Sequence, residues 1–168
     1  MEAFLEQFFM EWESALWKQS VPLQIEIVWR NKNFERFTGM KIDHIAIWTA
    51  NLEGLRNFYI HYFDASSTEI YYNHSKEFRS YFLSFDSDCR LEIMEMPRIP
   101  ASKNDVIKQF IGIIHFAINV GSREKVDHLT EALKKDGYRI INEPRTTGDG
   151  YYESVVLDPD GNRIEIMT

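Results

Sequence analysis

The chain has a single cysteine, Cys89, among its 168 residues, so no disulfide can form within it. No stretch approaches the roughly 20 consecutive apolar residues that a membrane-spanning helix requires. Basic residues are also in the minority, since 19 Lys and Arg stand against 26 Asp and Glu and the net charge is −7. This acidic balance argues against nucleic acid and against an anionic membrane surface as partners, because both attract basic patches.

The opening residues lack the pattern of a secretion signal, which is a basic stretch, an apolar run and a small-residue cleavage site. We therefore expect no signal peptide and a cytoplasmic protein. Hydrophobic residues make up 44% of the chain and charged residues 27%, an ordinary balance for a globular protein. The length fits one compact domain or a duplicated smaller one.

A short pattern occurs twice along the chain. Residues 42–47 and 113–118 are apolar stretches that each contain one histidine, and residues 90–94 and 163–167 each read Arg, apolar, Glu, Ile, Met. The two histidines are 71 residues apart and the two glutamates 73 (115 minus 44, and 165 minus 92). The pattern indicates a duplicated module that opens on a strand with a His and closes on a strand with a Glu.

The repeated histidines and glutamates are candidate metal ligands. A lone His in an apolar strand is usually structural, and a Glu between Leu and Ile can simply face water, since side chains alternate along a strand. The recurrence of both residue types at nearly one offset favours a common task instead. Two imidazoles and two carboxylates suit Zn, Ni, Co, Mn or Fe(II), and the set lacks the thiolates of structural zinc sites. The predicted ligands are His44, Glu92, His115 and Glu165.

Hydrophobic periodicity predicts the same order of elements in each module. In the first we expect a helix that Asn51 caps, with strands on either side of it: strand 41–49, helix 52–63 and strands 68–72, 78–85 and 90–96. In the second we expect a short helix over 105–110 before the repeat of this plan, with a helix that begins after Ser122 and stops at Gly137: strand 112–120, the helix, and strands 138–143, 151–157 and 162–168.

These elements define an α+β fold of two βαβββ modules. One sheet with a single helix leaves a face uncovered, so we expect the modules to form a cupped eight-stranded sheet around the metal site, with helices outside. The predicted parts are an extension over residues 1–39, a first module with its linker over 40–102, and a second module over 103–168. The extension is predicted to hold a helix over 1–18 with an aromatic stripe and a strand over 21–29.

The sequence resembles the vicinal oxygen chelate superfamily, to which glyoxalase I, extradiol dioxygenases, methylmalonyl-CoA epimerase and the fosfomycin and bleomycin resistance proteins belong. The resemblance covers about residues 40–168 and rests on residues 43–47, 57–59, 90–94 and 158–165. It implies metal ligands on the first and last strands of each module, at the four positions already singled out. The complete His/Glu/His/Glu set is similar to that of glyoxalase I.

The resemblance to glyoxalase I implies a metal-dependent lyase or isomerase that chelates adjacent oxygens of a small substrate and removes a proton next to a carbonyl. It implies Glu165 as the base, with Glu92 as the second acid/base, and one divalent metal per site, with Zn or Ni first and Co, Mn or Fe as alternatives. It further implies a homodimer in which two chains can share each site. Alternatives are an epimerase, an Fe(II) ring-opening dioxygenase, or a non-catalytic protein that binds a small molecule such as an antibiotic.

The chain departs from bacterial glyoxalase I at two positions that hold glutathione there. Trp48 stands in place of an Arg and Met96 in place of an Asn. Together with Tyr81, these residues form the predicted substrate-binding set and favour a more apolar or aromatic substrate than a glutathione adduct.

Overall fold

The computed structural model describes residues 39–168, and Ile42–Thr168 form one compact unit. The helix and strand predicted for residues 1–29 lie outside the described residues. Within 39–168, no helix is both long and apolar enough to cross a membrane.

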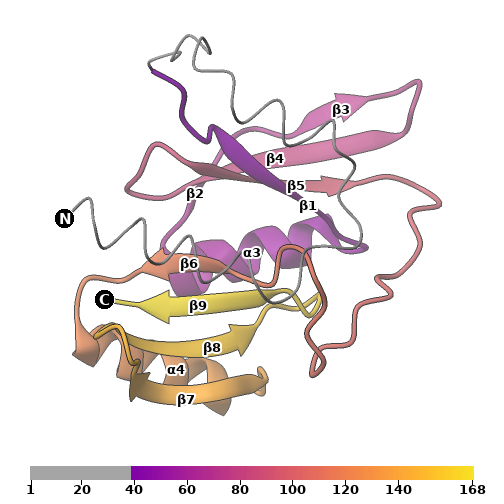
Figure 1. Ribbon diagram of the computed structural model, residues 1–168. Coiled ribbons are helices and arrows are strands. Elements are labelled where there is room, and N and C mark those ends of the chain that lie inside the picture. Colours follow the sequence, from indigo (N-terminus) through magenta and orange to yellow (C-terminus); the bar gives the residue numbers. More distant parts are fainter. Residues whose placement is uncertain (1–38) are drawn as a thin grey trace, which may run out of the picture. The chain divides into compact units, whose positions relative to one another are not determined.

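The first module builds one sheet, here called sheet A (Figure 1). Its strands run in the order β1-β5-β4-β2, with β3 also paired to β4, and the opening strand lies parallel to the closing strand. The elements are β1 (His44–Trp48), α3 (Leu52–Phe63), β2 (Ser66–Ser67), β3 (Tyr71–Asn73), β4 (Phe78–Ser84) and β5 (Arg90–Glu95).

The second module repeats this plan in sheet B (Figure 1). The strand order is β6-β9-β8-β7, and again the opening and closing strands, β6 and β9, are parallel neighbours. The elements are β6 (Phe116–Asn119), α4 (Arg123–Lys135), β7 (Ile140–Thr146), β8 (Tyr152–Leu157) and β9 (Arg163–Met167). The predicted βαβββ duplication is thereby confirmed.

Both helices begin and end where capping residues predict. The Asn51 side chain accepts a 3.0 Å hydrogen bond from the Gly54 amide at the start of α3, and the Ser122 hydroxyl accepts one of 3.3 Å from the Lys125 amide at the start of α4. After α4 the chain turns at Gly137, whose φ of +87° suits a residue without a β-carbon.

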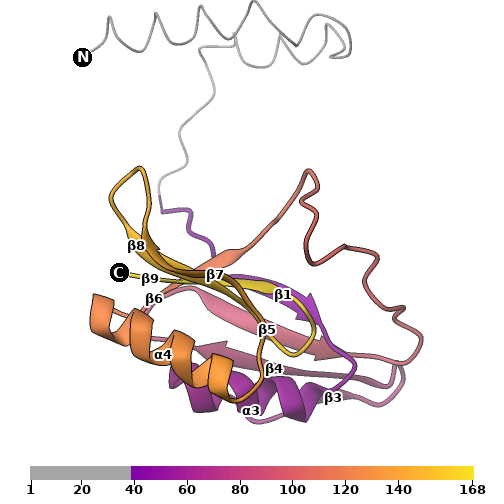
Figure 2. The same cartoon turned by 90° about the horizontal axis from the view of Figure 1, so that it is seen from below.

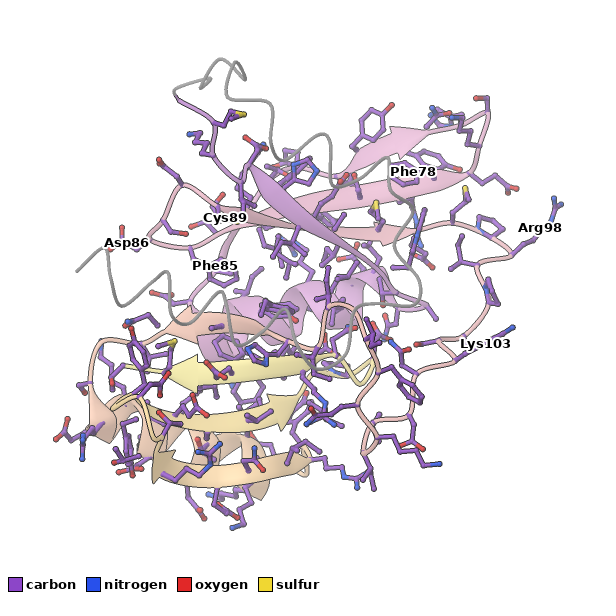
Figure 3. The ribbon with its side chains drawn as sticks, in the orientation of Figure 1. Phe78, Phe85, Asp86, Cys89, Arg98 and Lys103 are labelled. Atoms are coloured by element: carbon purple, nitrogen blue, oxygen red, sulfur yellow. The ribbon has the colours of Figure 1, made fainter. Side chains whose placement is uncertain are left out.

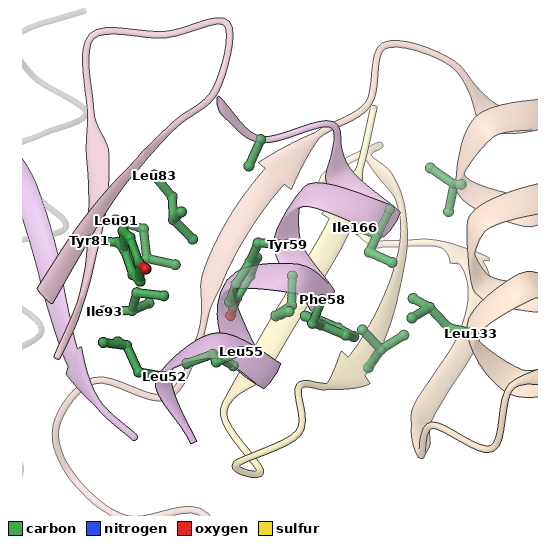
Figure 4. Close-up of a cluster of buried hydrophobic side chains, with 14 residues drawn as sticks. Leu52, Leu55, Phe58, Tyr59, Tyr81, Leu83, Leu91, Ile93, Leu133 and Ile166 are labelled. Atoms are coloured by element: carbon green, nitrogen blue, oxygen red, sulfur yellow. The ribbon is translucent and has the colours of Figure 1, made fainter. Parts of the chain in front are cut away.

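The helices cover one face of the strands, and Figure 2 shows α3 and α4 side by side beneath them. Figure 4 shows side chains of α3 between those of sheet A and those of the second module, so the two modules share one hydrophobic core. Tyr59 at its centre is fully buried. Among residues 39–168 no helix lies on the opposite face of either sheet, and this face is called the open face below.

Two local predictions differ from the structure. The prediction of a helix over 105–110 is wrong. The Asp105 carboxylate accepts hydrogen bonds from the amides of Ile107 and Lys108, and these bonds close a single turn that does not continue as a helix. The strand expected over 68–72 is divided into β2 and β3, so the described residues form two sheets with nine strands in all instead of eight. The linker between the modules, residues 96–114, is irregular, and Figure 3 shows Arg98 and Lys103 projecting outward from it.

Candidate metal centre

The first half-site consists of His44 on β1 and Glu92 on β5. These strands are parallel. Their register places Ala46 opposite Glu92, and His44 stands two residues before Ala46 on the same strand. Since side chains alternate, His44 and Glu92 share the open face of sheet A, while Ile45 packs toward the core. His44 Nε2 lies 3.8 Å from Glu92 Oε2, and 39% of the His side chain is exposed against 16% of the Glu.

The second half-site repeats this geometry with His115 and Glu165. His115 stands immediately before β6, and the register of β6 with β9 places Ala117 opposite Glu165, again two residues beyond the His. His115 Nε2 lies 3.4 Å from Glu165 Oε2, with exposed fractions of 39% and 15%. The duplicated sequence pattern has therefore produced two equivalent pairs of donor atoms.

The spacing within each pair fits a shared metal ion better than a hydrogen bond. A good N–H···O bond spans about 2.7 to 3.2 Å. Bonds of about 2.1 Å to one ion place adjacent ligand atoms about 3.0 to 3.5 Å apart in octahedral or tetrahedral geometry. The second half-site matches this range as it stands, and the first half-site needs to close by only a few tenths of an ångström.

The two half-sites do not meet within one chain. Among residues 39–168, no three His, Cys, Asp or Glu side chains come close enough together to hold one ion. The four residues predicted as ligands are thus placed as two pairs, each on the open face of its own sheet.

The first half-site has charged and aromatic neighbours that sequence reasoning did not assign. The Asp43 carboxylate contacts His44 and Arg90, and hydrogen bonds from these two side chains hold the pKa of Asp43 below its usual value. The Phe82 ring packs beside the His44 imidazole on the open face. Asp43 and Arg90 lie within the motifs at 42–47 and 90–94, so a charged residue within two positions of a candidate ligand was the available signal.

The second half-site has a different neighbour, the buried Glu153 on β8. Burial first, and then the nearby Glu165 carboxylate, raise the pKa of Glu153, while Arg145 opposes the rise. Arg145 Nη2 lies 3.1 Å from Glu153 Oε1. The second half-site therefore holds two carboxyl groups and a guanidinium, which sequence reasoning also missed.

The residues predicted to bind substrate lie in two different places. Trp48 and Met96, at the ends of β1 and β5, both line a groove of about 1170 Å³. Each stands four residues beyond a candidate ligand, which is about 13 Å along a strand. Tyr81 instead faces the helix side of sheet A, where it is buried and donates a 2.8 Å hydrogen bond to Glu53.

The groove is lined by both apolar and charged side chains. None of the four candidate ligands lines it. Its remaining wall comes from the β3–β4 hairpin, the linker and the turn before β9, with Tyr72, Arg79, Ile99 and Asn162 among the lining residues. It is therefore a separate feature beside the first half-site.

The comparisons with known proteins identify the family of this chain. The model of the Glyoxalase/Bleomycin resistance protein/Dioxygenase superfamily matches residues 41–166, three quarters of the chain. The chain belongs to this superfamily. An uncharacterized protein of Bacillus subtilis, YqjT, is 26% identical over 127 residues, which cover 74% of this chain and 95% of that relative.

Solved structures of other superfamily members share the fold. A glyoxalase family protein from Enterococcus faecalis is 23% identical with a TM-score of 0.61, over 76% of this chain and 97% of that one. The trypanothione-dependent glyoxalase I of Leishmania major is 21% identical with a TM-score of 0.62, over 77% and 87%. At these identities the likeness shows a common fold.

Proposed function

We propose that this superfamily member is a divalent-metal-dependent lyase or isomerase of the glyoxalase I type, which acts on a small molecule with adjacent oxygens. The proposal rests on one observation, the pair of half-sites that each present one imidazole nitrogen and one carboxylate oxygen at a spacing within a few tenths of an ångström of that suited to coordination. Superfamily members typically bind divalent metals, which supports the same reading.

The site is completed by a second copy of the chain. A His/Glu/His/Glu set needs both half-sites, and the described part of one chain keeps them apart. In a dimer, the first half-site of one chain faces the second half-site of its partner. The exposed apolar side chains of the linker, which include Phe110, Ile111 and Ile113, supply a surface suited to such pairing.

Four protein ligands leave room for two neighbouring substrate oxygens. A divalent ion held there would polarise a carbonyl and make the adjacent C–H more acidic. Glu165 would accept that proton, and a protonated Glu92 would donate one to the other face of the substrate, after which exchange with solvent would return both carboxyl groups to their starting states. Glu153, which pairs with Arg145, lies near Glu165, whose side chain is mostly buried.

Trp48 and Met96 line the groove beside the first half-site, so the proposed substrate carries an apolar or aromatic part and is not a glutathione adduct. Four residues of extended strand separate this apolar region from the metal ligands. A substrate long enough to reach from the metal ligands to this apolar region would have its reacting oxygens at the metal and its apolar part near Trp48.

The first experiment is metal content by elemental mass spectrometry, with His44→Ala and Glu165→Gln beside the unaltered chain. One divalent ion per chain, lost in H44A and largely kept in E165Q, supports the four-ligand site. E165Q is also expected to abolish turnover, because the amide cannot accept the proton. A chain that takes up no Zn, Ni, Co, Mn or Fe, even after soaking, would overturn the proposal.

The groove favours a second candidate function, a non-catalytic protein that binds an apolar small molecule. Trp48, Tyr72 and Met96 are among its apolar and aromatic lining residues. The two candidates differ in their dependence on metal. Affinity for an aromatic probe that survives both chelation and H44A supports the binding protein, whereas affinity lost with the metal supports the enzyme.

A further inference from the structure

The first half-site carries a polar contact that the second half-site lacks. His44 Nδ1 lies 3.0 Å from Asp43 Oδ2, and Arg90 Nη2 donates a 2.5 Å hydrogen bond to the same oxygen. A backbone hydrogen bond of 3.0 Å from the Arg90 amide to the Asp43 carbonyl holds the two strands together at this point. Asp43 is thus fixed at both its backbone and its carboxylate.

Phe82 completes this arrangement on the open face of sheet A. The His44 ring stands edge-on to the Phe82 ring, with 5.3 Å between centroids, and the Arg90 guanidinium lies over the same ring at 4.3 Å. The imidazole therefore has an apolar neighbour at its side and a carboxylate at Nδ1. Its remaining nitrogen, Nε2, faces Glu92.

The second half-site has none of these contacts. Ile114 stands where Asp43 stands in the first module, and Val155 is opposite Glu165 where Phe82 is opposite Glu92. Arg163, the counterpart of Arg90, donates instead to the Val106 and Ile107 carbonyls in the linker. Within residues 39–168, no side chain accepts a hydrogen bond from His115 Nδ1.

This difference has a chemical consequence for the two imidazoles. A neutral imidazole carries one proton, and a carboxylate at Nδ1 keeps the proton there as a donor. The lone pair is then held on Nε2, which points at the position of the metal. Such outer carboxylates orient metal-bound histidines and raise their basicity.

We propose that Asp43, held by Arg90, is a positioning residue that fixes His44 as its Nδ1–H tautomer and makes the first half-site the preorganised half of the metal centre. The role in metal binding rests on the proposed function, whereas the tautomer of His44 does not. His115, without a carboxylate at Nδ1, acquires its ligand tautomer only when the ion binds.

The tautomer is tested on the full-length chain after metal is removed by chelation. Long-range ¹H–¹⁵N correlation spectra in mildly alkaline buffer report which ring nitrogen carries the proton. The chain has five histidines, and single substitutions assign them. We expect His44 to show one Nδ1–H form, which Asp43→Ala converts to a mixture of tautomers.

Two further variants separate positioning from a general effect on the surface. Asp43→Asn keeps an acceptor oxygen but loses the charge that pairs with Arg90, so its spectrum is expected between the other two. Glu143→Ala breaks another surface ion pair, that between Lys134 and Glu143, away from the open faces and should leave His44 unchanged. A His44 signal that is the same in D43A and in the unaltered chain overturns the proposal.

Titration calorimetry with Zn²⁺ or Ni²⁺ tests the consequence for binding. Loss of an outer carboxylate typically weakens metal affinity about 10- to 100-fold, and we expect this range for D43A and no change for E143A. A tautomer shift without loss of affinity also overturns the positioning role. If the unaltered chain binds neither ion, the proposed function fails, while the spectra still decide the tautomer.

Discussion

The Tyr59 hydroxyl donates a 2.9 Å hydrogen bond to Asp158 Oδ2, which joins the first-module helix to the last turn of the second module. Both residues are buried. The same carboxylate also accepts from the Asp160 and Asn162 amides and from the Asn162 side chain, and so organises the turn that leads into β9. Because β9 carries Glu165, this contact links the shared core to the second half-site.

Tyr59→Phe should lower the free energy of unfolding by about 1 to 3 kcal/mol, because a buried carboxylate loses one of its donors. Urea denaturation measures this. Tyr62→Phe is the matched control, since Tyr62 gives up a hydrogen bond to the exposed Asp136 and should change stability by less than about 0.5 kcal/mol. Equal losses of unfolding free energy in the two variants would mean that the buried Tyr59–Asp158 hydrogen bond stabilises the fold no more than an exposed one.

Mixing two inactive variants tests whether the metal centre is shared between chains. His44→Ala damages the first half-site and His115→Ala the second. A mixed dimer then contains one site with both defects and one intact site, so random exchange should restore about a quarter of the wild-type sites in a two-fold dimer. Metal content and turnover after co-refolding measure the recovery. Four ligands supplied by one chain would give no recovery.

The exposed linker should hold the dimer together. Ile111→Asp and Phe110→Asp place a charge on fully or largely exposed apolar side chains, and we expect both variants to be monomers by light scattering. Ile111→Leu keeps the apolar surface and should remain a dimer. Dimers of unchanged stability in both Asp variants would place the interface elsewhere.

Metal should stabilise the folded chain by an amount that grows with the ratio of the free ion concentration to the Kd. An ion that binds only the folded state at a free concentration of 100 times its Kd adds about 2.7 kcal/mol. Added Zn²⁺ or Ni²⁺ should therefore raise Tm, and a chelator should lower it again, in the unaltered chain. His44→Ala should show neither shift. The same rise in H44A would point to binding away from the proposed centre.

Several features of this molecule follow from the sequence because they depend on neighbours along the chain. Alternation within 42–47 and 90–94 places His44 and Glu92 each on the side of its own strand that lies opposite the neighbouring Ile residues. Capping by Asn51 and Ser122 likewise fixes the start of each helix. The repeat itself then predicts two modules of one design, with a His and a Glu on neighbouring strands of each.

Other features depend on residues far apart in sequence, and only the tertiary structure decides them. Tyr81 resembles a binding-site aromatic in sequence, but the packing of α3 turns it toward Glu53. Periodicity places the two half-sites on open faces, yet the distance between them is set by how the modules pack on the shared core. The contact of Asp43 with Arg90, 47 residues away, arises in the same way from strand pairing. Local pattern thus determines which face each ligand occupies, while long-range packing determines which ligands meet.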